Sequence, residues 1–520
     1  MRRTTLVLPA LLLAAFAINL DTTIVNVALP TLVRELHASN TQLQWIVDAY
    51  NLVFAAFVLA AGSLSDRVGR KGVLLVGLAL FGCASIAGGF GSNPGQLIVA
   101  RCLMGLGAAL IFPATLSLIS NIFTERGARA KAIGLWGATA GAGVALGPIV
   151  GGWLLQHFSW SSIFFALAPV AALTAALVAL GVPTSRDSTA PGADRPGLVL
   201  STGAIALLIY TIIEAPAYGW LSSRSIAGFA LALAALAGFV VRERRTSEPM
   251  LDVGLFKYLR FTAASVSVTI AFFSLSGFIF LIVQYFQFLK SYGPLANGVR
   301  LLPVAFSVAI TSILGTRLAL RFGTKLVVVA GLLSLTAGYT WASTSATSTS
   351  YLTIACVMVL IGSGMGLTSA PATEAIMGVV PTDKAGVGSA VNDATRLLGS
   401  TLGVAVIGSV YASLYASRLS TAATAHLPTR LLATAHESIG AALETAGHLG
   451  SSGQPALAGA LHAAATSAFL GGLSAGCLVA AAVASVGAIV ALALLPSQPI
   501  TAAVEAVPAS SSTRAVVAVD

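Results

Sequence analysis

Apolar segments of about 20 residues recur along almost the whole chain, and this feature most limits how the chain can fold. A helix needs about 20 predominantly apolar residues to cross the hydrocarbon core of a bilayer. Hydrophobic residues make up 57% of the 520 positions and charged residues only 9%, whereas roughly a quarter of an average soluble protein is charged. These charges are too few to cover a soluble surface, so the sequence predicts an all-α polytopic membrane protein.

The apolar pattern predicts fourteen transmembrane helices. They lie at about 5–29, 44–62, 73–91, 95–119, 131–154, 160–181, 197–215, 224–241, 261–288, 297–319, 325–343, 351–378, 386–413 and 467–495. Alternate connections are basic, and the first of them contain Arg2, Arg3, Arg67, Arg70 and Lys71. Cytoplasmic loops carry the excess of Lys and Arg, so we expect a multi-pass protein of the cell membrane with both termini in the cytoplasm. The net charge of +10 then reflects this topology, and no nucleic-acid partner is expected.

Polar linkers divide the predicted helices into groups of six, two and six. We expect a first six-helix bundle at 1–182 and a linker region at 183–260 that holds two extra helices and an interfacial segment. A second six-helix bundle follows at 261–495. It includes an extracellular insertion at about 414–466, which we expect to form a hairpin or short amphipathic helices. The low-complexity tail at 496–520 is expected to be disordered and cytoplasmic.

An internal repeat relates the two six-helix groups. The stretch "FPATLSLISNIFTERGARA" aligns without gaps to "APATEAIMGVVPTDKAGVG", which places Pro113 on Pro371 and Leu116 on Glu374. The stretch "GSLSDRVGRKGVLLVG" has a weaker counterpart in "GTRLALRFGTKLVVVA". Paired halves of this kind are typical of secondary transporters, whose substrate site lies between the halves near the bilayer midplane.

The connection between the second and third predicted helices combines glycines, one acid and several cations. The residues concerned are Gly62, Asp66, Arg67, Gly69, Arg70 and Lys71. The glycines permit a tight turn, and Asp66 is suited to pair with a cation or a helix N-terminus. The pattern resembles the signature loop of the major facilitator superfamily. That resemblance implies a conformational gating loop that latches the outward-facing state until its ion pairs break.

The fifth predicted helix carries a regular series of small residues around a proline. The series is Gly134, Gly143, Gly147, Pro148, Gly151 and Gly152. Small residues at such spacing let a neighbouring helix approach closely, whereas a proline inside a helix ordinarily costs about 3 kcal/mol. The series resembles the motif that marks antiporters within the superfamily, and the alternative is ordinary small-residue packing.

Two charges lie inside apolar helices, where a charge is costly and usually functional. Asp21 belongs to "NLDTTIVNVALP" together with Asn26, and Arg101 belongs to "LIVARCLMGLGAAL". The first stretch resembles the first-helix motif of the 14-helix drug:proton antiporter family. The second resembles a fourth-helix motif of the superfamily, although Met104 stands where a glutamine is common. The resemblance implies that Asp21 and Arg101 take part in proton or substrate coupling. The alternative for Arg101 is a side chain that extends to the membrane interface.

Further charges complete the set of candidates. Glu374 is the second leading carboxylate for coupling, and Asp393 and Arg396 stand one turn apart, where they would neutralise each other. Glu214 lies at the end of an added helix, for which a structural role is favoured. All six histidines map to loops or helix ends, so buried carboxylates must carry any coupled proton.

The combined signals predict a proton-coupled antiporter that exports hydrophobic drugs or metabolites, with cationic ones favoured, across the cytoplasmic membrane. Its partners would be a small-molecule substrate, protons and lipid, with no cofactor besides the proton gradient and no metal, and a monomer would suffice. One alternative is export of a neutral or anionic natural product, lipid or siderophore, with Arg101 binding the substrate. Another is a non-transporting sensor or scaffold. The chain contains no HExxH or Walker motif, so an enzyme is not expected.

Overall fold

The computed structural model describes residues 2–123, 125–185, 194–246, 253–379, 385–423 and 429–496, and within these ranges the chain forms helices and no strand. Apart from Pro496, the tail predicted to be disordered therefore lies outside the described residues. Most of the polar linker that precedes the two extra helices does so as well.

The first group of helices forms one bundle. Its members are α1 (Arg2–Leu36), α2 (Asn40–Val68), α3 (Arg70–Gly89), α4 (Pro94–Ile122), α5 (Arg126–His157), α6 (Ser162–Phe165) and α7 (Leu167–Gly181). α1 packs against α4, α5 and α7, whereas α2 and α3 both pack against α4. Ser39 and Gln42 form a capping box at the start of α2, which satisfies free backbone N–H groups at that end.

The second group of helices forms a matching bundle. Its members are η1 (Val253–Lys257), α10 (Leu259–Gln284), η2 (Tyr285–Leu289), α11 (Pro294–Arg300), α12 (Leu302–Phe322), α13 (Thr324–Ala342), α14 (Tyr351–Met377), α15 (Ala385–Ala423) and α18 (Pro455–Leu494). η1 is a short 3₁₀ helix and η2 is a π-helical turn that continues α10. α14 packs against α10, α12 and α13, and α18 packs against α10, α13 and α15.

The two extra helices, α8 (Arg195–Tyr218) and α9 (Ser223–Arg245), form a pair. α8 also packs against α2 of the first bundle and α15 of the second. A small apolar cluster of Leu52, Ile209, Ile212, Ile213 and Ala405 fills this junction. The added pair therefore covers one seam between the two bundles.

Twelve helices in the described part of the chain are long and apolar enough to cross a membrane. The two remaining predicted spans fall on α2 and α5, which are 29 and 32 residues long. The predicted spans thus coincide with helical segments of sufficient length, of which 160–181 is divided between α6 and α7 and 297–319 between α11 and α12. The all-helical membrane fold is confirmed.

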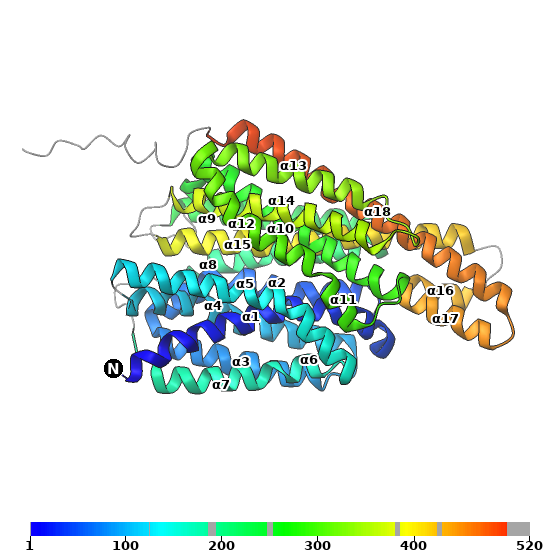
Figure 1. Ribbon diagram of the computed structural model, residues 1–520, viewed down its shortest axis with the longest axis horizontal. Helices are drawn as coiled ribbons and strands as arrows, with labels where there is room; N and C mark the ends of the chain where they lie inside the picture. Colours follow the sequence, from blue (N-terminus) through cyan, green and yellow to red (C-terminus); the bar gives the residue numbers. More distant parts are fainter. Residues whose placement is uncertain are drawn as a thin grey trace, which may run out of the picture.

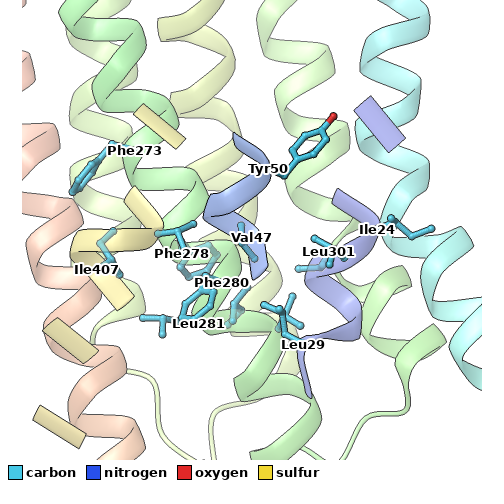
Figure 2. Close-up of a cluster of buried hydrophobic side chains, with 14 of the residues drawn as sticks. Ile24, Leu29, Val47, Tyr50, Phe273, Phe278, Phe280, Leu281, Leu301 and Ile407 are labelled. Atoms are coloured by element: carbon cyan, nitrogen blue, oxygen red, sulfur yellow. The ribbon is translucent and has the colours of Figure 1, made fainter. Parts of the chain in front are cut away.

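The two bundles lie side by side along the length of the molecule (Figure 1), with α1–α7 in blue to cyan on one side and α10, α12–α15 and α18 in green to red on the other. One hydrophobic core joins them. Figure 2 draws part of it and labels residues of both bundles, among them Ile24, Val47, Tyr50, Phe278, Phe280 and Ile407.

The repeat seen in the sequence has a structural counterpart at two glycines. Gly69 alone joins α2 to α3 with φ of +129°, and Gly323 alone joins α12 to α13 with φ of +86°. Only glycine adopts such angles without strain. Each bundle therefore turns two successive helices on a single residue at the corresponding place.

Hydrogen bonds between the two bundles lie, in the described residues, at the end where α1 finishes and α2 begins, which we call the α1–α2 end. Gln287 Nε2 donates to the backbone oxygen of Val27 at 2.9 Å, and Arg34 donates to Gln287 Oε1 at 3.5 Å. The π-helical turn η2 places Gln287 in this position. The two bundles are thus held together at this end.

Two short helices, α16 (Thr429–Glu437) and α17 (Ile439–Ser451), occupy the segment between α15 and α18. They project at one end of the molecule, beyond most of the other helices (Figure 1). Gly440 of α17 lies against Val33 of α1 and Phe288 of η2, so α17 contacts both bundles. Both long flanking helices continue past the predicted spans, because α15 runs to Ala423 and α18 starts at Pro455.

Candidate functional site: a buried ion pair between two helices

The centre of the site is an ion pair between Asp21 of α1 and Arg101 of α4. Arg101 Nη1 donates to both carboxylate oxygens of Asp21, at 2.9 and 2.8 Å. The side chain of Asp21 is 0% exposed and that of Arg101 is 1% exposed. Removing one partner from a buried pair typically costs about 3–5 kcal/mol, because the other charge is left uncompensated. Burial of either charge is therefore tolerated only because the other residue compensates it.

α2 holds the guanidinium from its other side. Arg101 Nε donates to the backbone oxygen of Ile46 at 3.0 Å, and the guanidinium carbon lies 4.3 Å from the centre of the Tyr50 ring. The Tyr50 hydroxyl in turn donates to the backbone oxygen of Ile18 on α1 at 3.4 Å. Arg101 thus ties three helices together and does not extend to the membrane interface.

The glycine series of α5 packs directly on the helix that carries Asp21. An added Cβ at Gly143 would lie 2.7 Å from the Phe16 oxygen, and one at Gly147 would lie 3.0 Å from the Leu20 oxygen. Gly151 meets Ile24 in the same way, one turn further along. Since real Cβ atoms do not fit at such distances, the glycines are what lets α1 and α5 approach this closely.

Two further members of the series, Pro148 and Gly152, face the second bundle. Gly152 meets the Pro294 oxygen and Leu295 at the start of α11, and the Pro148 backbone lies against Gly298 of α11. One short sequence motif therefore sets the spacing of α5 to α1 within its own bundle and to α11 across the interface. The surroundings of Gly134 are outside the described part of the chain.

The predicted gating loop is more compact than the sequence indicates. α2 continues through it to Val68, and α3 begins at Arg70, so that Gly69 is the only residue between the two helices. Lys71 Nζ donates to the backbone oxygen of Ala179 at 2.8 Å. Arg67 is exposed, and Gly62 lies beside Pro113 of α4. The side chain of Asp66 is outside the described part of the chain.

The remaining acidic candidates do not join the central pair. Glu374 lies in the last turn of α14, half-buried, and its Oε2 has no hydrogen-bond partner among the described residues. Asp393 and Arg396 form an ion pair within α15, with 3.7 Å between Oδ1 and Nη1. Glu214 of α8 accepts a hydrogen bond from Trp45 Nε1 of α2 at 3.2 Å. Asn26 donates to the backbone oxygen of Thr22, one turn back in α1.

Asp48 of α2 is a buried acidic residue that the sequence pattern did not single out. Asp48 of α2 is fully buried, and neither carboxylate oxygen has a hydrogen-bond partner in the described part of the chain. The signal was present in the sequence: Gln44 and Asp48 are four residues apart and therefore share one face of the helix. No group of three or more His, Cys, Asp or Glu that could hold a metal ion occurs among the described residues.

Comparison with known proteins agrees with a transporter built from two six-helix halves. The model of the Major Facilitator Superfamily matches residues 11–404. The chain belongs to the major facilitator superfamily, as its motifs predicted, and is a multi-pass membrane transporter of small molecules.

Named relatives place the chain among efflux proteins. It is 36% identical to the multidrug efflux pump LfrA of Mycolicibacterium smegmatis, over 85% of this chain and 86% of that protein. It is 34% identical to the tetracenomycin C resistance and export protein of Streptomyces glaucescens, over 97% of this chain and 94% of that protein. A bacterial homologue of the lysosomal transporter Spinster has the same fold, with a TM-score of 0.66 over 95% of this chain and 99% of that one, at 17% identity.

Proposed function

We propose that the protein is a proton-coupled antiporter that exports hydrophobic, cationic drugs or metabolites across the cytoplasmic membrane. The observation that carries the proposal is the buried pair of Asp21 and Arg101, whose charge changes by one unit when a proton binds. The names of the relatives support efflux as the direction of transport.

The pair offers a simple coupling mechanism. With Asp21 ionised, the pair has no net charge and a cationic substrate can approach. When Asp21 takes up a proton, its bond to Arg101 weakens and the uncompensated guanidinium repels the cation. A proton from the outside would thus favour substrate release there, and return of the proton to the cytoplasm would restore the pair.

The proposal includes the orientation of the protein in the membrane. Basic residues gather at the end of the bundle opposite the α1–α2 end, and they include Arg67, Lys71, Arg242, Arg244 and Arg245. The positive-inside rule makes that end cytoplasmic and the α1–α2 end extracellular. Both termini are then cytoplasmic, and the proton gradient is the only energy source required. One chain contains both halves, so a monomer suffices.

Export of a neutral or anionic natural product is the second candidate. It is favoured by the relative that is named for export of tetracenomycin C. Recognition of an anion by Arg101 is opposed by the structure around it, because Asp21 already neutralises that side chain and the guanidinium is 1% exposed. A neutral substrate is compatible with the same pair.

Transport by the purified protein in liposomes tests the proposal. Wild-type protein is expected to concentrate a cationic dye in liposomes with an acidic lumen, and collapse of the pH gradient should abolish this. Asp21→Asn should remove the response to the gradient. Because this variant also leaves Arg101 uncompensated, it is compared with the wild type at equal amounts of folded protein. A panel of cationic, neutral and anionic compounds separates the two candidates, and accumulation that ignores the pH gradient would contradict both proton coupling and the role of Asp21.

A further inference from the structure

A line of buried polar side chains runs along one face of α2, outside the pair of Asp21 and Arg101. It consists of Asn40, Gln44, Asp48 and Asn51, which are 4%, 1%, 0% and 4% exposed. Their spacing of four, four and three residues places them on a single face of the helix. The α2 polar face, as we call it, extends from the α1–α2 end to the level of the Tyr50 ring that contacts Arg101.

These side chains have unpartnered polar atoms in the described part of the chain. The atoms are Asn40 Oδ1, both polar atoms of Gln44, both carboxylate oxygens of Asp48 and Asn51 Oδ1. Leaving a buried polar group without a partner costs about 1–3 kcal/mol, and more for a charged group. Four such residues in a row are therefore not explained by packing, which apolar side chains of similar size would serve better.

Several charged groups on the helices packed against α2 are engaged with other partners. Asp21 of α1 and Arg101 of α4 bind each other, Glu214 of α8 accepts from Trp45, and Asp393 pairs with Arg396 on α15. Lys71 on α3 donates to Ala179, and Arg418 of α15 lies along Gly471 of α18. Asp48 is therefore not neutralised by any of these, and its charge depends on whether it holds a proton.

Contact with the second bundle closes the α2 polar face. The side chain of Gln44 lies against Gly408 of α15, in the space that a side chain at that position would occupy. α2 and α15 belong to different bundles, so movement of one bundle away from the other would uncover this face at the α1–α2 end. α15 covers the α2 polar face and belongs to the other bundle, and the two bundles must move relative to each other during transport.

We propose that Asp48 is a second proton-binding carboxyl, which protons reach from the extracellular side along Asn40 and Gln44 when α15 moves away from α2. The step is the binding of a proton from extracellular water to a carboxylate oxygen, and no other bond forms or breaks. This inference rests on the proposed proton-coupled function and assigns it a further residue and a route.

The test compares two transport modes in liposomes: dye accumulation driven by a pH gradient, and dye exchange at equal pH on both sides. Asp48→Asn is expected to lose gradient-driven accumulation and to keep exchange, because exchange needs no proton. Asp48→Glu should restore accumulation. Gln44→Leu keeps the carboxyl but interrupts the route, so it should shift accumulation to a steeper gradient.

Gln284→Leu is the matched control, since Gln284 is also a buried glutamine with an unpartnered oxygen but lies on α10. It should behave as the wild type. If both Asp48→Asn and Gln44→Leu accumulate dye at the same pH gradients as the wild type, the inference is overturned. It is also overturned if Asp48→Asn loses exchange together with accumulation. If the wild type itself ignores the gradient, the proposed function fails, and this result is distinct from failure of Asp48 alone.

Discussion

At the scale of residues, the buried pair of Asp21 and Arg101 decides how the first bundle is assembled. Each residue could be picked out from the sequence, because a charge within an apolar helix is costly wherever it lies. Their pairing could not be predicted, since it depends on how α1 and α4 cross. Asp48 was missed for the opposite reason: it stands near the start of its helix, where a charge is expected to contact water.

Arg101→Leu should destabilise the protein strongly, because it leaves Asp21 buried and uncompensated. We expect a loss of about 3–5 kcal/mol in the free energy of unfolding, visible as a lower midpoint of thermal denaturation in detergent. The double variant Asp21→Asn with Arg101→Leu should recover most of this loss. Equal stability of the single variant and the wild type would mean that the pair does not form.

At the scale of elements, hydropathy located the helices but not their ends. α2 continues to Val68, α15 to Ala423, and α18 starts at Pro455, all beyond the predicted spans. An apolar pattern marks the part of a helix that crosses lipid, and the helix itself continues through polar residues as long as its backbone bonds are made. The π-helical turn η2 has no such pattern, and its placement of Gln287 was not predictable.

Gly147→Ala tests the close approach of α5 to α1. The added Cβ would lie 3.0 Å from the Leu20 oxygen and would overlap Thr23, and overpacking of this kind typically costs about 1–3 kcal/mol. Gly203→Ala in α8 is the control, because nothing lies within 4 Å of a Cβ at that position. A thermal midpoint for Gly147→Ala equal to that of the control would refute the tight contact.

α16 should lose stability in mildly acidic solution. His436 Nε2 lies 3.1 Å from Ser420 Oγ, and burial lowers the pKa of His436 below its usual 6.5. The unfolded segment then binds the proton more readily, so the stabilisation present above pH 6.5 is lost as the pH falls from 6.5 through the lower pKa of His436 in the folded protein. Hydrogen exchange of α16 should be faster at acidic than at neutral pH, and His436→Gln should remove this difference, whereas the exposed His448→Gln should not.

At the scale of the whole molecule, the two bundles meet at the α1–α2 end through bonds that must break if the proposed exporter is to open outwards. The internal repeat predicted the two bundles, and the single-glycine turns at Gly69 and Gly323 correspond to each other. The contacts between the bundles could not be predicted from the repeat. Gln287 reaches the first bundle from the π-helical turn η2, and α17 from the segment between α15 and α18. The position of α8 over one seam depends on the assembled bundles.

Gln287→Leu should shift the protein towards the outward-open state. It removes the hydrogen bond to Val27, and a bond worth about 1 kcal/mol corresponds to roughly a fivefold change in the ratio of the two states. Labelling of a cysteine introduced at the α1–α2 end, in a background without the native cysteines, reports that ratio. Gln284→Leu is the control, since Gln284 donates within its own helix, and equal labelling of the two variants would contradict a latch at Gln287.

The most direct test of the account is dye transport by the purified protein in sealed liposomes, with the pH gradient as the only energy source. The proposed function predicts that the wild type accumulates a cationic dye when the lumen is acidic and stops when the gradient is collapsed. It also predicts that Asp21→Asn does not respond to the gradient. Accumulation by the wild type without a gradient, or a normal response by Asp21→Asn, would contradict it.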